Sequence, residues 1–82
     1  MGAVPRPGPH PPTVDELDVM LLADVCWTRS NTVGGVQTEQ GMSWARAALA
    51  GYEYLTRHAS EAVAASAADS AAHLRLYNRE LP

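Results

Sequence analysis

The chain has 82 residues and a formal net charge of −3, and all six of its basic residues are arginine. This balance provides no basic stripe for a phosphate backbone, so we expect no nucleic-acid partner. A single cysteine excludes an internal disulfide, and no apolar run reaches the length of a membrane span. We therefore expect a cytoplasmic protein, or one inside a cytoplasmically assembled particle, with no membrane partner.

Residues 1–12 contain five prolines. Proline fixes φ and lacks an N–H donor, so this segment is expected to form an extended arm and not a helix or strand. The arm is either flexible or bound along a partner. Arg6, Pro9 and Pro12 also fit the R-x-x-P-x-x-P spacing of peptides that bind aromatic grooves. The sequence thus predicts a Pro-rich arm over residues 1–12 and a helical domain over residues 13–82.

The first helix is expected over residues 13–29. Thr13 and Glu16 have the spacing of a capping box, in which the hydroxyl accepts from the third amide and the carboxylate reaches back. One face is the main apolar stripe, made of Val14, Leu17, Leu21, Val25 and Thr28. The opposite face is also largely apolar, which is typical of a helix buried on more than one side. On that second face Met20, Ala23 and Trp27 are expected to point away from the partner helix.

Residues 30–41 form a Gly-rich connection. Gly34 and Gly35 tolerate the positive φ angles of a two-residue turn, so a short β-hairpin is an alternative to an irregular loop. No lysine follows these glycines in the pattern of a phosphate-binding loop.

A long second helix is expected over residues 42–81, with Thr38 or Ser43 as its N-cap. Its apolar stripe keeps one phase without Pro, and we list its members as Ala45, Leu49, Tyr52, Leu55, Ala59, Val63, Leu74, Tyr77 and Leu81. A break near His58–Ser60, giving three short helices, is the alternative. The predicted fold is all-α: a helical hairpin with a short N-terminal helix, a Gly-rich connection and one long C-terminal helix, preceded by a Pro-rich extended arm.

Few residues in this sequence suggest chemistry. Asp69 and His73 are four residues apart on one helical face, but a stable zinc site needs three or four protein ligands. Cys26 has apolar and acidic neighbours, which suits a buried structural thiol better than a nucleophile. We predict no catalytic site, no metal and no cofactor.

The predicted shape favours assembly. In such a hairpin the first helix covers the second only as far as Ala59, so the remainder would project with its apolar stripe uncovered. We therefore predict that the chain contacts another protein, either a second copy or a larger complex, through Val63, Ser66, Ser70, Leu74, Tyr77 and Leu81, together with Met20 and Trp27. The expected function is that of a small structural or assembly protein, such as a minor virus or phage particle component or an accessory subunit. The alternative is a soluble regulator or inhibitor that docks its helix on a single target protein.

Overall fold

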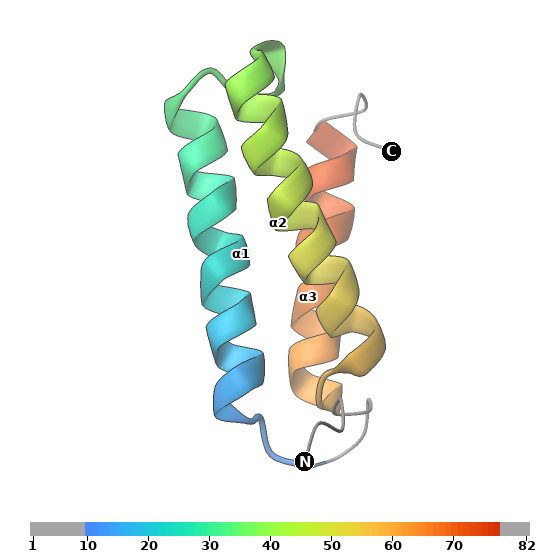
Figure 1. The fold of residues 1–82 in the computed structure, drawn as a ribbon. Coiled ribbons are helices and arrows are strands. Elements are labelled where there is room, and N and C mark those ends of the chain that lie inside the picture. Colours follow the sequence, from blue (N-terminus) through green and yellow to red (C-terminus); the bar gives the residue numbers. More distant parts are fainter. Residues whose placement is uncertain (1–9, 78–82) are drawn as a thin grey trace.

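The computed structural model describes residues 10–77, and within that range it contains three α-helices and one short 3-10 turn but no strand. Helix α1 spans Val14–Thr32, α2 spans Glu39–His58 and α3 spans Glu61–Tyr77, while the turn η1 spans Gly35–Gln37. Successive helices run in opposite directions (Figure 1), and α2 packs against both of its neighbours. Helices α1 and α3 make few contacts with each other. The all-α prediction is confirmed, and residues 1–9 of the Pro-rich arm lie outside the described range.

Helix α1 begins where the sequence predicts. The Thr13 side chain accepts a hydrogen bond from the Glu16 amide at 3.1 Å, which satisfies one of the unpaired donors of the first turn. The helix continues to Thr32, three residues beyond the predicted end at Arg29.

The connection between α1 and α2 is a helical turn, so the β-hairpin alternative is wrong. Gly34 and Gly35 have φ angles of 102° and 63°, a region that side chains with a Cβ rarely adopt. Thr38 then accepts a hydrogen bond from the Gly41 amide at 2.9 Å and donates one to the Val33 carbonyl at 2.7 Å. Thr38, one of the two predicted caps, is therefore the N-cap of α2, which starts at Glu39 and not at residue 42.

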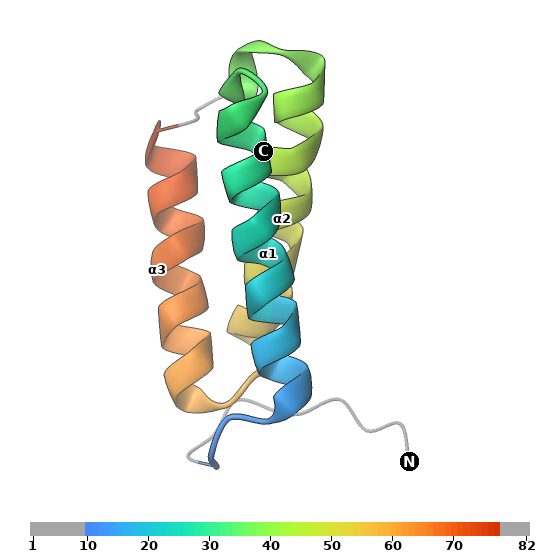
Figure 2. The same ribbon diagram turned by 90° about the vertical axis from the view of Figure 1, so that its left-hand side faces the viewer.

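The prediction of one long helix over residues 42–81 is wrong, and the alternative break near His58–Ser60 is what the structure contains. Helix α2 ends at His58, and Ala59 adopts an extended conformation with φ −87° and ψ 174°. The carbonyl of Ser60 accepts the first α-helical hydrogen bond of α3, from the Ala64 amide at 2.7 Å. Helix α3 then returns alongside α2 (Figures 1 and 2), so the projecting overhang does not exist.

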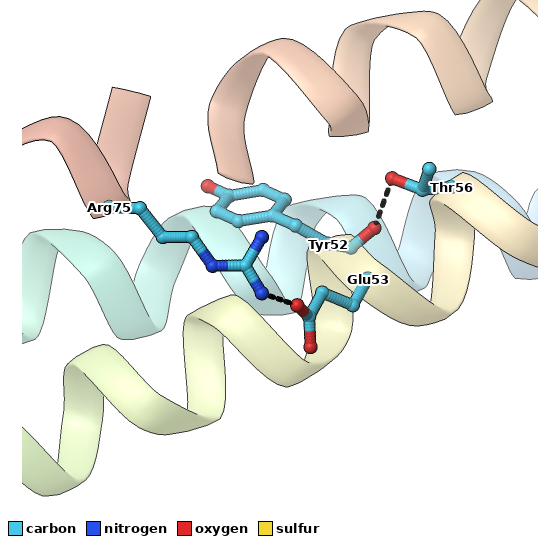
Figure 3. Close-up of polar contacts among 4 residues, drawn as sticks. All are labelled: Tyr52, Glu53, Thr56 and Arg75. Atoms are coloured by element: carbon cyan, nitrogen blue, oxygen red, sulfur yellow. Dashed lines mark hydrogen bonds and ion pairs between the residues drawn. The ribbon is translucent and has the colours of Figure 1, made fainter. Parts of the chain in front are cut away.

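The core between the helices is rich in alanine. Its buried members are Ala23 on α1, Ala45, Ala48, Leu49, Tyr52 and Leu55 on α2, Ala59 at the corner, and Val63, Ala67, Ala71 and Leu74 on α3. Small side chains let helix axes approach closely, which is what the sequence suggested for residues 59–70. The close approach takes place within one chain. An ion pair between Arg75 and Glu53 also joins α3 to α2 (Figure 3), but both side chains are partly exposed, so it adds little stability.

Helix α1 faces the core with residues spaced seven apart: Glu16, Ala23 and Ser30, all buried. At the upper end the Ser30 hydroxyl donates to the Gly41 carbonyl at 2.7 Å. Midway, a Cβ built on Gly51 would lie 3.1 Å from the Cβ of Ala23, so α1 and α2 are nearly in backbone contact there.

At the lower end of α1, Glu16 accepts a hydrogen bond from the backbone amide of Ser60 at 3.0 Å, across 44 residues of sequence. Glu16 thereby caps α3 from another helix. Met20 and Trp27 pack half-buried against the core, whereas Leu21 on the predicted main stripe is exposed. Helix α1 is therefore turned the opposite way from the prediction. Small and hydrogen-bonded residues form its inward face, and its largest aliphatic side chains face outward.

Candidate functional site

A row of exposed aliphatic side chains lies on the outer face of α1, opposite the face that packs on the core. We call this row the outer stripe, and it consists of Val14 (74% exposed), Leu17 (52%), Leu21 (62%), Leu22 (63%) and Val25 (49%). Residues three and four positions apart share one side of a helix, so these side chains form a continuous surface, with Leu22 at its edge. Burying a Val or Leu fully contributes about 1.5–3 kcal/mol, so exposing five neighbouring ones is unfavourable for an isolated chain. Exposed patches of this kind mark interaction surfaces.

Charged side chains flank the outer stripe. On one edge lie the exposed side chains of Asp18 and Arg29, and the Arg29 guanidinium carbon is 5.9 Å from the centre of the Trp44 ring on α2. This distance is at the outer limit of a cation–π contact. A shallow groove of about 420 Å³ follows the same face and is lined only by α1, through Leu21, Asp24, Val25, Thr28, Arg29 and Thr32. The outer face is thus apolar along its middle and charged at its margins.

A second, more polar cleft lies where the three helices meet. It has a volume of about 360 Å³ and is lined by Asp24, Trp27, Tyr52, Asp69, Ser70 and His73. The Tyr52 hydroxyl donates to Asp24 at 2.5 Å. Burial and the neighbouring Asp24 carboxylate raise the pKa of Tyr52 above its ordinary value of 10.0, so the phenol stays protonated at neutral pH.

The geometry of this cleft favours a structural role. A protonated Tyr52 that donates to Asp24 joins α2 to α1 and presents no nucleophile. The close-up in Figure 3 shows the backbone carbonyl of Tyr52 on α2, which accepts a hydrogen bond from the Thr56 hydroxyl at 2.9 Å. Within residues 10–77, no group of three His, Cys, Asp or Glu side chains is placed to hold a metal ion.

Cys26, the one cysteine of the chain, lies half-buried against the core. The sequence suggested a buried structural thiol, whereas the structure leaves Cys26 partly exposed.

The residues predicted to contact another protein lie in several different places. Val63 and Leu74 are buried in the core between α2 and α3, so they have no free surface to offer another chain. Ser66 is exposed on α3, and Ser70 lines the polar cleft. The Tyr77 side chain and Leu81 lie outside the described residues. Of the predicted residues that the structure describes, Trp27 and Ser70 line the same polar cleft, but Val63, Ser66 and Leu74 do not join them in one exposed surface.

The surface that does emerge was visible in the sequence but was assigned to the core. Leu17, Leu21 and Val25 were recognised as a stripe, because their spacing is that of one helix face. Asp18 and Arg29 at its edge were not singled out. The missing signal was the seven-residue spacing of Glu16, Ala23 and Ser30, which marks the inward face but does not look apolar.

Comparisons of this chain with protein-family models, with curated proteins and with solved structures gave no match. Within the described range, no helix is both long and apolar enough to cross a membrane.

Proposed function

We propose that this chain is a small, non-catalytic structural or assembly protein that binds another protein surface through the outer stripe of α1. The observation that carries the proposal is the exposure of Val14, Leu17, Leu21, Leu22 and Val25 in one continuous row. Interface cores are depleted in charge and rich in large apolar groups, with a polar rim, and the outer face of α1 has that arrangement.

The way the fold is built supports this role. Helix α1 is attached to the rest of the chain by Glu16, Ala23 and Ser30, so its outer stripe takes no part in holding the three helices together. The most apolar face of the helix is therefore available to a partner without any rearrangement. The sequence suggested a contact through residues between 63 and 81 together with Met20 and Trp27, and the proposed contact surface is now the outer stripe of α1.

A photo-crosslinking experiment tests this function. A benzophenone amino acid replaces Leu21 in the outer stripe, and a matched control places it at Ala65, an exposed position on α3. In cells that express the chain, we expect protein adducts from position 21 that position 65 does not give. Adding Val25→Asp is expected to remove those adducts by placing a charge in the interface. Equal adducts from both positions, or none from position 21, would contradict the proposed function.

A further inference from the structure

The charges along the edge of the outer stripe suggest which protein covers it. Asp18 lies near the start of α1 and Arg29 near its end, and both are exposed. At 100° per residue the two side chains leave the helix in directions roughly 20° apart, so they belong to the same edge. The edge therefore carries a negative charge at one end of the stripe and a positive charge at the other.

This charge order is self-complementary in one orientation only. When two copies of a helix pack antiparallel about a two-fold axis, the same edge of each copy meets, and the start of one lies beside the end of the other. Asp18 of each copy would then face Arg29 of the second copy, twice by symmetry. In a parallel pair the two-fold axis runs along the helices and brings opposite edges together, so Asp18 and Arg29 of the two copies would not face each other.

The aliphatic side chains fit the same register. Placing Leu21 opposite Val25 of the second copy also places Val14 opposite Thr32. In that register Asp18 of one copy and Arg29 of the other are offset from direct opposition by one residue, which is about 1.5 Å along the helix axis. Asp24 lies on the opposite edge, where it accepts the hydrogen bond from Tyr52 and so is directed toward α2. One register thus pairs Leu21 with Val25 at the centre of the apolar row and brings Asp18 to within one residue of Arg29.

The available area also suits a second copy. Five Val and Leu side chains that are half to three-quarters exposed present roughly 500 Å² of apolar surface. Two copies would together bury roughly 1,000 Å², which is about the least that a specific interface needs. A partner of this size and charge pattern is supplied by the chain itself.

From these observations we propose that the partner of the outer stripe is a second copy of this chain, packed antiparallel along α1 with Asp18 and Arg29 paired across the two-fold axis. The inference rests on the proposed function, since it names the protein that covers the stripe.

Sedimentation equilibrium of the purified full chain tests whether the partner of the outer stripe is a second copy. We expect a reversible monomer–dimer equilibrium in which Leu21→Asp weakens dimerisation by more than about 100-fold, because it buries an unpaired charge. Leu76→Asp is the matched control, since Leu76 is 63% exposed but lies on α3, and it is expected to leave the dimer unchanged. Leu17→Asp serves as a second stripe variant. Circular dichroism of each variant checks that the helices remain.

Charge reversal tests the orientation. Asp18→Arg and Arg29→Asp are each expected to weaken the dimer by about tenfold, and the double variant is expected to restore it. Mixing the two single variants is expected to give a heterodimer. A dimer that Leu21→Asp leaves intact overturns the proposed surface, and a double variant without recovery overturns the antiparallel register.

A wild-type chain that stays monomeric at about 0.5 mM overturns the second copy as partner. The proposed function is judged separately by the crosslinks from position 21 in cells. If position 21 forms adducts with a different protein and the purified chain is monomeric, the proposed function stands and the proposal that the partner is a second copy is rejected.

Discussion

Replacing Glu16 tests how the third helix is held against the first two. Glu16 is 3% exposed, and its carboxylate accepts a hydrogen bond from the backbone amide of Ser60 at the start of α3. In an ordinary capping box this amide is paired by a glutamate three residues further along the same helix. In α3 that position is Val63, which cannot accept a hydrogen bond, so Glu16 supplies the missing acceptor from α1.

The size of the effect follows from the groups involved. A hydrogen bond to a charged group contributes about 1.5–3 kcal/mol, and a buried amide left without a partner is itself unfavourable by about 1–3 kcal/mol. We therefore expect Glu16→Ala to lower the free energy of unfolding by about 2–3 kcal/mol, and Glu16→Gln, which keeps an acceptor oxygen, by about 1 kcal/mol. The control Glu61→Gln removes an exposed charge from the same end of α3 and should cost no more than about 0.5 kcal/mol.

The pH dependence of Glu16 gives an independent test. Burial by itself raises the pKa of this carboxyl, but the hydroxyl and amide of Ser60 and the Thr13 amide outweigh it and hold the pKa below its ordinary value of 4.5. The second carboxylate oxygen and the Ser60 hydroxyl form no hydrogen bond, so the bond from the Ser60 amide is the contact that favours the charged form. A lowered folded-state pKa means that the charged Glu16 stabilises the fold above pH 4.5, and that this stability is lost as pH falls through the folded-state value.

Urea unfolding of wild type and Glu16→Gln across the acid range measures both effects. The stability difference between them should be constant near neutral pH and should shrink below the ordinary pKa of a glutamate. The reasoning is refuted by a difference that does not change with pH, or by a Glu16→Ala variant as stable as the Glu61 control.

Substitutions at Thr13, Gly41 and Tyr52, with Gly51 as a control, test other parts of the fold by the same denaturation measurement. Thr13→Ala should cost about 1 kcal/mol through the lost cap of α1, and an unchanged stability would contradict the cap. Gly41→Ala should lower the free energy of unfolding by about 3 kcal/mol or more, despite the helix propensity of alanine, because the new Cβ would overlap the Gly35 carbonyl. Gly51→Ala, inside the same helix, should stay within about 1 kcal/mol of wild type. The raised pKa of Tyr52 means that the fold loses stability as pH rises above 10.0, where the unfolded phenol ionises first, and Tyr52→Phe should lack this alkaline loss.

Local signals in the sequence predicted the start of α1 and offered Thr38 as one of two candidate caps of α2. Thr13 and Thr38 cap α1 and α2, and glycines with positive φ form the connection between them. Each of these features depends on residues within about five positions, so a pattern can reveal it. The all-α class follows from the same local signals.

The break between α2 and α3 could not be read in the same way. Neither Gly nor Pro marks it, and the apolar stripe keeps its phase because both helices turn the same side toward one core. A periodic pattern cannot distinguish a straight helix from two helices folded back on each other. The contact that fixes the corner, between Glu16 and Ser60, spans 44 residues and involves two polar groups.

The predicted orientation of α1 was wrong for a related reason. Hydrophobicity ranks Leu17 and Leu21 above Glu16 and Ser30 as core residues, but Glu16 and Ser30 are the ones buried. A polar group can be buried without loss when its partner is also buried, and both partners here lie on other helices. The candidate interaction surface therefore could not be predicted from the sequence, because the hydrogen bonds that orient α1, from Ser60 to Glu16 and from Ser30 to Gly41, join residues far apart in the chain.

The placement of aliphatic side chains connects stability to association. A chain of this size buries only about 60% of its unfolded surface, and here much of the core is alanine. Five larger aliphatic side chains remain outside, so the isolated chain lacks the stability they would provide if covered. Whatever covers the outer stripe binds the folded state and not the unfolded one, and so stabilises it by mass action. If the covering surface is a second copy, the thermal midpoint of the purified chain must rise with its own concentration, while that of Leu21→Asp must not. A midpoint that is the same at all concentrations would mean that the fold tolerates its exposed stripe alone, and that contacts of the inward face of α1 with the other helices suffice to hold it.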